Sequence, residues 1–289
     1  MPKKQKPKHK YQNLQNFLAL LLLTALIILS SCWFIYSTET INYSNFLNGF
    51  IIGIIAQTID GSIGMAYGIT ATTFLLSQGA SPAMASSSIH ISEIFTTGAS
   101  GLSHWRLNNI DKKLFLNLFF PGIFGGLIGV LILTNIDGKI LKPWISLYLL
   151  IMGIYIILKA FKKNIFKTTL NSKKITPLAF AGGMVDAVGG GGWGPVVTTT
   201  LLSSGHEPKK TIGSVNSAEF FITTSTGLSF AIFVGVSNPE TIFGLIAGGV
   251  LIAPFAAKIT TKLPTKLIMF IVGILISSLS LITVSKFFF

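Results

Sequence analysis

Four acidic residues stand in otherwise apolar surroundings and form two pairs with the same spacing. Asp60 and Glu93 lie 33 residues apart, and Asp186 and Glu219 repeat that interval further along the chain. A carboxyl group within a membrane is costly and is by default a candidate for function. We predict that one or more of these acids carries a coupling proton. For the aspartates, a capping role beside a helix break is the alternative.

A glycine-rich segment follows each aspartate and predicts a broken helix. After Asp186 come four successive glycines, residues 189–192, and then Trp193, Gly194 and Pro195. Each glycine costs about 1 kcal/mol relative to alanine inside a helix, whereas proline suits the first turn of a new one. Backbone amides at such a start attract anions. We therefore predict an anion site at Gly190, Gly191, Gly192, Trp193 and Gly194. The alternative is that the glycines only allow close helix packing.

The helices expected after the two breaks carry polar stretches, residues 86–93 and 213–219. At helical spacing His90 and Glu93 share a face, and the second stretch repeats this arrangement. Neutral donors on that face suit a sulfur oxyanion without a buried arginine. The side chains that we expect to contact the anion are Ser88, His90, Ser214 and Asn216. Single serines in such helices also serve packing or interhelix hydrogen bonds, and this remains open.

An intramembrane serine protease is the alternative from the enzyme class, because the sequence 98–101 has the G-x-S-G form of rhomboid nucleophiles. A nucleophile such as Ser100 needs a base within hydrogen-bond reach. The later histidines are His104, at the same predicted helix end, and His206, in a predicted loop. The single cysteine, Cys32, excludes an internal disulfide and a cysteine-only metal site. We expect no enzyme activity, no cofactor and no metal.

The chain contains an internal duplication. Residues 60–101 match residues 186–227 at a constant offset of 126, with 15 of 42 positions identical and no gap. Both aspartates and both glutamates are among the identical positions. Self-similarity of this kind marks a repeat architecture, so we expect the two breaks to occupy equivalent places.

Composition places the chain in a bilayer. Half of its residues are hydrophobic and 11% are charged, and stretches of the roughly 20 apolar residues that a crossing requires recur. The net charge of +13 is concentrated in clusters at residues 3–10, 159–174 and 258–266. Such clusters flank spans on the cytoplasmic side. We therefore expect contact with lipid rather than nucleic acid.

The charge pattern predicts an all-α membrane protein with two inverted-topology repeats. About seven full transmembrane helices and two re-entrant segments place every strong basic cluster inside, with the N-terminus cytoplasmic. Three crossings then separate equivalent points of the repeats, and an odd number inverts the second copy. The expected boundaries are a basic tail 1–13, a transmembrane helix 14–36, repeat 1 at 45–160, a basic linker 161–174 and repeat 2 at 175–286. As an alternative, the N-terminal stretch also has the form of a lipoprotein signal ending at Cys32.

The second repeat resembles the TauE/SafE sulfite exporters. The resemblance is carried by residues 182–195, by Gly205-His206-Glu207-Pro208 and by residues 213–219, and it extends over both halves from about residue 48. It implies a transporter of sulfite, organosulfonates or related anions in the bacterial plasma membrane. The first half departs from the glycine pattern at Ser62, Ile63, Met65 and Ala66. An anion channel stays open as an alternative, as do the coupling ion, expected to be a proton, and a homo-oligomeric state.

Overall fold

The computed structural model describes residues 42–288 except 64, 107, 162–169, 237 and 260–264. Every element that these residues form is a helix. The predicted tail 1–13, the transmembrane helix 14–36 and Cys32 lie outside the described residues, as does most of the linker 161–174.

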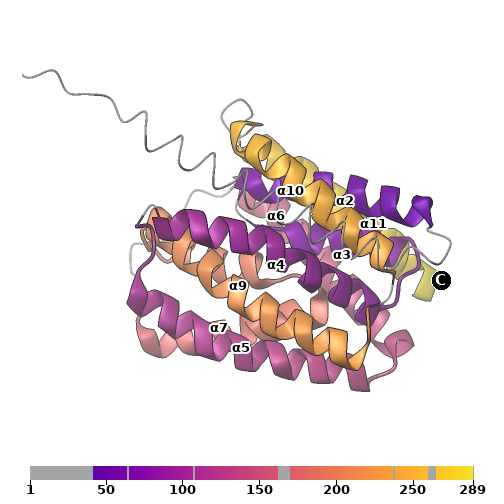
Figure 1. The fold of residues 1–289 in the computed structure, drawn as a ribbon, viewed down its shortest axis with the longest axis horizontal. Coiled ribbons are helices and arrows are strands. Elements are labelled where there is room, and N and C mark those ends of the chain that lie inside the picture. Colours follow the sequence, from indigo (N-terminus) through magenta and orange to yellow (C-terminus); the bar gives the residue numbers. More distant parts are fainter. Residues whose placement is uncertain are drawn as a thin grey trace, which may run out of the picture. The chain divides into compact units, whose positions relative to one another are not determined.

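The described helices follow one another with short connections. In chain order they are α2 (Tyr43–Ile63), α3 (Tyr67–Ser77), α4 (Pro82–Arg106), α5 (Lys112–Asn135), α6 (Gly138–Phe161), α7 (Ser172–Gly189), the π-helical turn η1 (Gly194–Thr198), α8 (Thr199–Ser203), α9 (Pro208–Phe233), α10 (Pro239–Ile259) and α11 (Thr265–Phe288). In Figure 1, α4 and α9 run side by side in the middle, with α5 and α7 on one side and α2 and α10 on the other. The two predicted breaks are therefore present, one between α2 and α3 and one between α7 and η1.

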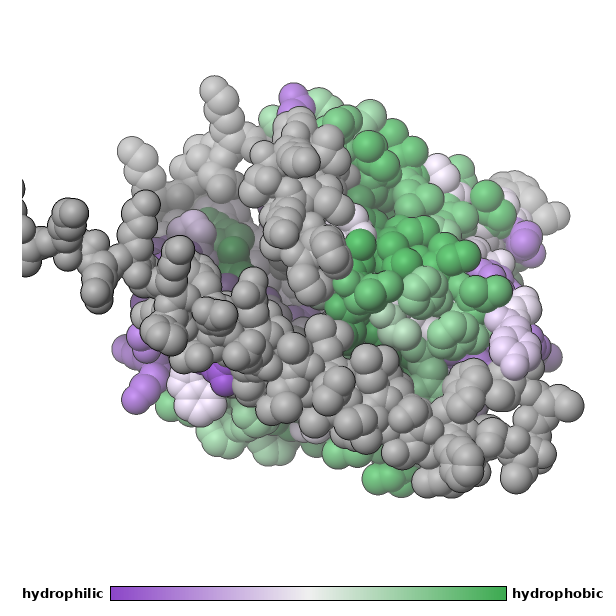
Figure 2. Space-filling view, turned by 45° about the horizontal axis from the view of Figure 1, so that its top comes forward, coloured by the Kyte–Doolittle hydropathy of each residue, from purple (hydrophilic) through white to green (hydrophobic). Residues whose placement is uncertain are grey.

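Three of the described helices are long and apolar enough to cross a membrane, namely Lys112–Asn135, Gly138–Phe161 and Met269–Phe287. Their outer faces are apolar, and along α5 the exposed side chains Leu116, Phe120, Phe124 and Ile128 recur at every fourth residue. Figure 2 shows a continuous hydrophobic patch in the middle of one face, with hydrophilic residues mostly toward its left and right edges. An exposed apolar surface of this kind suits a surrounding of lipid.

Helices α4 and α9 cross in antiparallel directions. A methyl group on Gly101 would lie 3.3 Å from Cα of Ser217, and one on Gly227 would lie 3.3 Å from the carbonyl carbon of His90. At the crossing the hydroxyl oxygens of Thr97 and Thr223, residues 126 apart in the chain, are 3.4 Å from each other. Positions early in one helix therefore meet positions late in the other.

The second broken segment starts and finishes at the same end of the helices. The backbone amide of Leu170, just before α7, donates to Nε2 of His206 in the turn after α8 at 3.0 Å. The amide group of Asn117, near the start of α5, donates to the hydroxyl of Ser172 at 2.9 Å. The chain therefore turns back at the break instead of continuing in one direction.

The first broken segment turns back in the same way. The hydroxyl of Thr241, at the start of α10, donates to the carbonyl of Asn45 near the start of α2 at 3.5 Å. Helix α10 begins shortly after α9 ends, and the end of α9 lies beside the beginning of α4 because these two helices are antiparallel. The turn at residues 78–81, which follows α3, leads directly into that beginning of α4.

Candidate functional site

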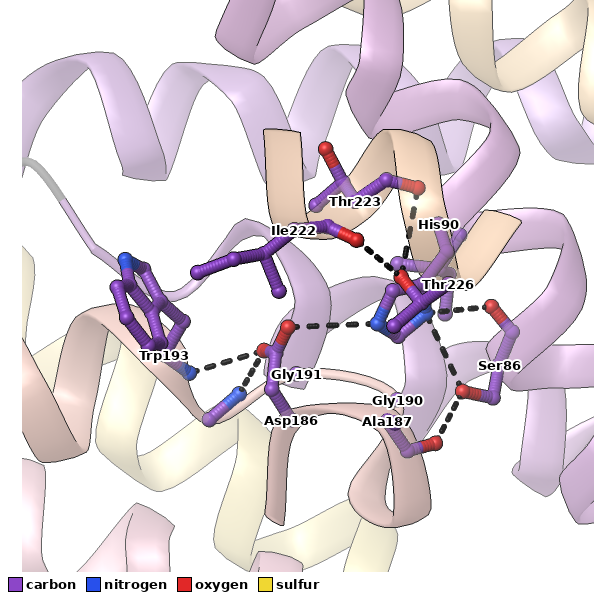
Figure 3. Close-up of polar contacts among 12 residues, drawn as sticks. Ser86, His90, Asp186, Ala187, Gly190, Gly191, Trp193, Ile222, Thr223 and Thr226 are labelled. Atoms are coloured by element: carbon purple, nitrogen blue, oxygen red, sulfur yellow. Dashed lines mark hydrogen bonds and ion pairs between the residues drawn. The ribbon is translucent and has the colours of Figure 1, made fainter. Parts of the chain in front are cut away.

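The second break is organised around the carboxylate of Asp186. Helix α7 ends in a left-handed turn, with φ of 63° at Gly190 and 141° at Gly191, a conformation that glycine adopts without steric cost. Oδ1 of Asp186 then accepts hydrogen bonds from the backbone amides of Gly192 at 2.7 Å and Trp193 at 2.9 Å (Figure 3). The carboxylate thus binds the amides that the interrupted helix leaves without partners.

These bonds bear directly on the anion site expected at the glycines. The amides of Gly190 and Gly191 donate to the Asp186 carbonyl, while those of Gly192 and Trp193 donate to its carboxylate. From the sequence, we expect the backbone amides of this segment to donate to a substrate anion. In this arrangement the protein's own carboxylate occupies that position, so Asp186 has the capping role that the sequence left as the alternative.

The first break repeats the arrangement with fewer glycines. The carboxylate of Asp60 accepts a hydrogen bond from the backbone amide of Tyr67, and these two residues correspond to Asp186 and Trp193 at the offset of 126. Ala66 precedes α3 with φ of 90°, a left-handed value that is strained for alanine. An aspartate therefore caps the half-helix after each break.

The two breaks meet backbone to backbone. A methyl group on Gly68 would lie 2.6 Å from Cα of Gly191, and one on Gly194 would lie 3.1 Å from Cα of Met65. These two contacts join equivalent positions of the repeats. The hydroxyl of Thr72 also donates to the Gly190 carbonyl. The half-helix after each break thus packs on the other break.

The glutamates lie beside this junction. The side chain of Glu93 is buried, and its Oε2 has no hydrogen-bond partner. Glu219 is half-buried, and the hydroxyl of Thr223 donates to its carbonyl at 2.9 Å, as that of Thr97 does to the carbonyl of Glu93. The charges of Asp186, Glu219 and Asp60 all act on Glu93. The fold thus brings the four predicted acids within electrostatic reach of one another.

One of the four predicted side-chain donors, His90, contacts the second break. His90 is fully buried, and its Nε2 lies 3.3 Å from Oδ2 of Asp186. Ser88 is buried on the same helix. Ser214 instead accepts a hydrogen bond from the Asp111 amide at 2.8 Å, so it fixes the start of α5.

Asn216 binds the serine of the protease alternative. Its Nδ2 donates to Oγ of Ser100 at 2.8 Å. His104, one turn beyond Ser100, has its Nδ1 3.2 Å from Nδ2 of Asn109. The contacts given for Ser100 within the described structure thus include no general base.

Lys159 is a residue of this region that the sequence analysis assigned only to the basic inner cluster. It lies in the last turn of α6, where a lysine would be expected to extend toward the lipid headgroups. Its Nζ instead donates to the Thr199 hydroxyl at 2.7 Å and lies 4.0 Å from Sδ of Met65. One cation thus contacts both broken segments. Its place in a basic cluster at a helix end gave no signal in the sequence that it would turn inward.

Comparison with known proteins gives a consistent result. A family model described as sulfite exporter TauE/SafE matches residues 49–283, a range that contains both breaks and all four acids. YtnM of Bacillus subtilis strain 168, a probable membrane transporter protein, is 42% identical over 230 residues, which make up 77% of each chain. YunE of the same organism, also a probable membrane transporter protein, is 22% identical over 252 residues, 78% of this chain and 92% of that one. No solved structure matches. The resemblance read from the sequence is confirmed.

Substituting Gly191 with alanine should destabilise the junction. The new methyl group would lie 2.3 Å from the backbone nitrogen of Ile69, and φ at this position is 141°. We expect the unfolding midpoint of the detergent-purified protein to fall by roughly 5 °C or more. Ala66→Gly is the matched control, because its φ of 90° suits glycine, and it should leave the midpoint unchanged within about 2 °C. Equal midpoints for both variants would contradict this description of the junction.

Proposed function

Because the chain belongs to the sulfite exporter TauE/SafE family, we propose that this membrane transporter moves a small sulfur-containing anion, sulfite or an organosulfonate, across the bacterial plasma membrane. Transport is secondary and coupled to protons. The observation that carries the proposal is the junction at which Gly68 meets Gly191 and Gly194 meets Met65, beside four acids. Broken helices that meet between two halves of a chain are where secondary transporters bind substrate and coupling ion.

The directions of the helices support an inverted-repeat architecture. Helices α4 and α9 correspond to each other at the offset of 126 and run antiparallel, as do α6 and α11, in which Gly153 faces Ser277 while Gly273 faces Ile157. An axis within the membrane plane relates equivalent helices in this way. Both broken segments, which turn back, then act as re-entrant segments that enter from opposite sides. The N-terminus is cytoplasmic in this arrangement.

Glu93 and Glu219 are the coupling groups in this proposal. An isolated carboxylate is expensive to bury, and a carboxyl group that binds a proton removes that cost. Oε2 of Glu93 has no hydrogen-bond partner and can therefore carry such a proton, whereas Oδ1 of Asp186 already accepts two backbone hydrogen bonds. An anion that approaches the junction meets repulsion from ionised glutamates, and protonation relieves it. Proton uptake and anion binding therefore favour each other.

Lys159 supplies the positive charge that an anion requires. Its ammonium contacts Thr199 and Met65, both neutral, and no carboxylate among the described residues forms an ion pair with it. The buried hydroxyl of Thr198 beside this position has no partner. We assign Lys159 to the attraction of the anion toward the junction, a role that the amides bound by Asp186 do not fill.

Uptake of anions into proteoliposomes tests the function itself. Sulfite, thiosulfate, sulfate, sulfoacetate and acetate would be compared with and without an imposed pH gradient. We expect saturable uptake of a sulfur anion, with about tenfold accumulation per pH unit at one proton per anion, since tenfold corresponds to ~1.4 kcal/mol. Uptake that ignores the pH gradient would indicate a channel, and no uptake of any sulfur anion would overturn the substrate assignment.

Replacing Glu93 with glutamine should separate anion movement from the proton. Glutamine keeps the size of the side chain but cannot ionise, so accumulation driven by a pH gradient should be lost while downhill exchange of anion continues. Glu219→Gln should act in the same direction. Glu240→Gln, at the start of α10, is the matched control and should behave as the native protein. Unchanged gradient-driven accumulation in both test variants would remove the glutamates from coupling.

Replacing Lys159 with glutamine should weaken the binding of the anion. We expect KM to rise roughly tenfold, corresponding to ~1.4 kcal/mol, with a smaller change in kcat, and Lys159→Arg should recover part of the loss. Lys142→Gln serves as the control, because Lys142 is half-buried on the same helix and donates to the carbonyl of Ala80 at 3.1 Å. Equal effects of the two glutamine substitutions on KM would argue against a specific role for Lys159.

A further inference from the structure

His90 and Asp186 form the contact that ties the second break to α4. His90 belongs to α4, in the first repeat, and Asp186 to the last turn of α7, in the second, so the contact joins the two repeats (Figure 3). Both side chains are buried, and the ring of Phe230 from α9 lies against the imidazole with centroids 5.5 Å apart. Nε2 of His90 and Oδ2 of Asp186 face each other directly at 3.3 Å, so a hydrogen between them belongs to one of these two side chains.

The surroundings of Nδ1 determine which nitrogen of His90 carries a hydrogen. Nδ1 lies 2.8 Å from the carbonyl oxygen of Ser86, which can only accept. The second neighbour is Oγ of Ser86 at 3.2 Å, and this hydroxyl uses its own hydrogen to donate to the Ala187 carbonyl at 2.6 Å. Both neighbours therefore accept from the ring, and Nδ1 must be a donor.

The other nitrogen then faces a carboxylate oxygen. A neutral imidazole with its hydrogen on Nδ1 presents a lone pair at Nε2, and Oδ2 of Asp186 also presents lone pairs at a distance of 3.3 Å. Two acceptors in this position repel each other unless a proton lies between them. Oδ1 of Asp186 is already bound by two amides and holds the carboxylate in place. The contact therefore requires one proton beyond that on Nδ1.

We propose that His90 and Asp186 hold one exchangeable proton between them and so form a latch that docks the second helix break on α4. With the proton present the latch is closed, whether the proton rests on Nε2 or on Oδ2. Loss of the proton leaves two facing acceptors, and the break separates from α4. The role of this movement in transport rests on the proposed function, whereas the proton itself does not.

The latch shares its electrostatic surroundings with the other titratable groups of the junction. The charge of Asp186 acts on Glu93 of α4, Glu219 of α9 and Tyr148 of α6. Tyr148 also donates its hydroxyl to the Gly191 carbonyl at 3.1 Å, so it contacts the same break. Because these groups interact, protonation of the glutamates and of the latch are linked. A proton taken up at Glu93 is thereby communicated to the break.

Among the residues that the structure describes, one of the two breaks carries this device. The position equivalent to His90 in the second repeat is Asn216, whose side chain does not titrate and donates to Ser100 instead. The first break has its capping aspartate, Asp60, but the side chain that corresponds to the imidazole of His90 is the amide of Asn216. The proton of the latch therefore acts on the second break and not on the first. In this duplicated fold, the position of one break depends on protonation and that of the other does not.

Solid-state nitrogen NMR of the membrane-embedded protein tests the protonation directly. The chain has four histidines, so the difference between spectra of the native protein and His90→Gln identifies the signals of His90. We expect Nδ1 to carry a hydrogen at neutral pH and Nε2 to show a hydrogen bond with a carboxyl group. A hydrogen on Nε2 together with a bare Nδ1 would overturn the latch. No substrate is needed, so this result does not depend on the transport activity.

Hydrogen exchange tests the opening of the latch. Amide protection would be followed by mass spectrometry in the peptide that contains Gly192 and Trp193, with correction for the intrinsic effect of pH on exchange. Protection should fall about tenfold in the native protein as pH rises through the release of the proton. Asp186→Asn should show no such fall, because Nδ2 of asparagine donates permanently to Nε2 while its oxygen accepts from the amides. Identical pH profiles for the two proteins would contradict the latch.

Discussion

The constraint on which this structure depends is that a broken helix in a membrane protein must find partners for its free backbone amides without water. The carboxylate of Asp186 accepts hydrogen bonds from the amides of Gly192 and Trp193, and that of Asp60 accepts one from the amide of Tyr67. Each cap comes from the helix just before the break, so these amides find their partner within their own broken segment. The two segments can then pack on each other through glycines, which bring their backbones into contact at Gly68 and Gly191.

Such capping changes where substrate recognition can reside. The Asp186 carboxylate binds the amides of Gly192 and Trp193, which favours side chains around the junction as the groups that would recognise an anion in the proposed function. The proposal accordingly assigns attraction of the anion to Lys159 and assigns the proton to Glu93 and Glu219. In the proposed latch, the proton shared by His90 and Asp186 determines whether the second break stays docked on α4. The charged residues, the capping aspartates and the proposed movement all lie at the junction of the two breaks.

Much of this arrangement could be predicted from the sequence because it follows from local rules and from the duplication. Aspartates beside glycine runs, repeated at the offset of 126, indicated both breaks, and the family resemblance was confirmed. Partners across the fold could not be predicted. The spacing of residues does not show that the Asp186 carboxylate binds the amides that were expected to bind substrate. Nor does it show that Ser214 bonds to the start of α5 or that the Lys159 side chain turns inward. Each of these depends on which helices become neighbours, which residue types alone do not specify.

The central claim is that two equivalent broken segments enter the membrane from opposite sides, and cysteine accessibility tests it most directly. Gln78 follows the first broken segment and Glu207 follows the second, and both side chains are exposed. Each would be changed to cysteine in a Cys32→Ser background, which removes the single native cysteine, and intact cells would be treated with a membrane-impermeant maleimide. The account predicts labelling of residue 78 from outside and of residue 207 only after permeabilisation. Labelling of both residues from the same side would contradict it.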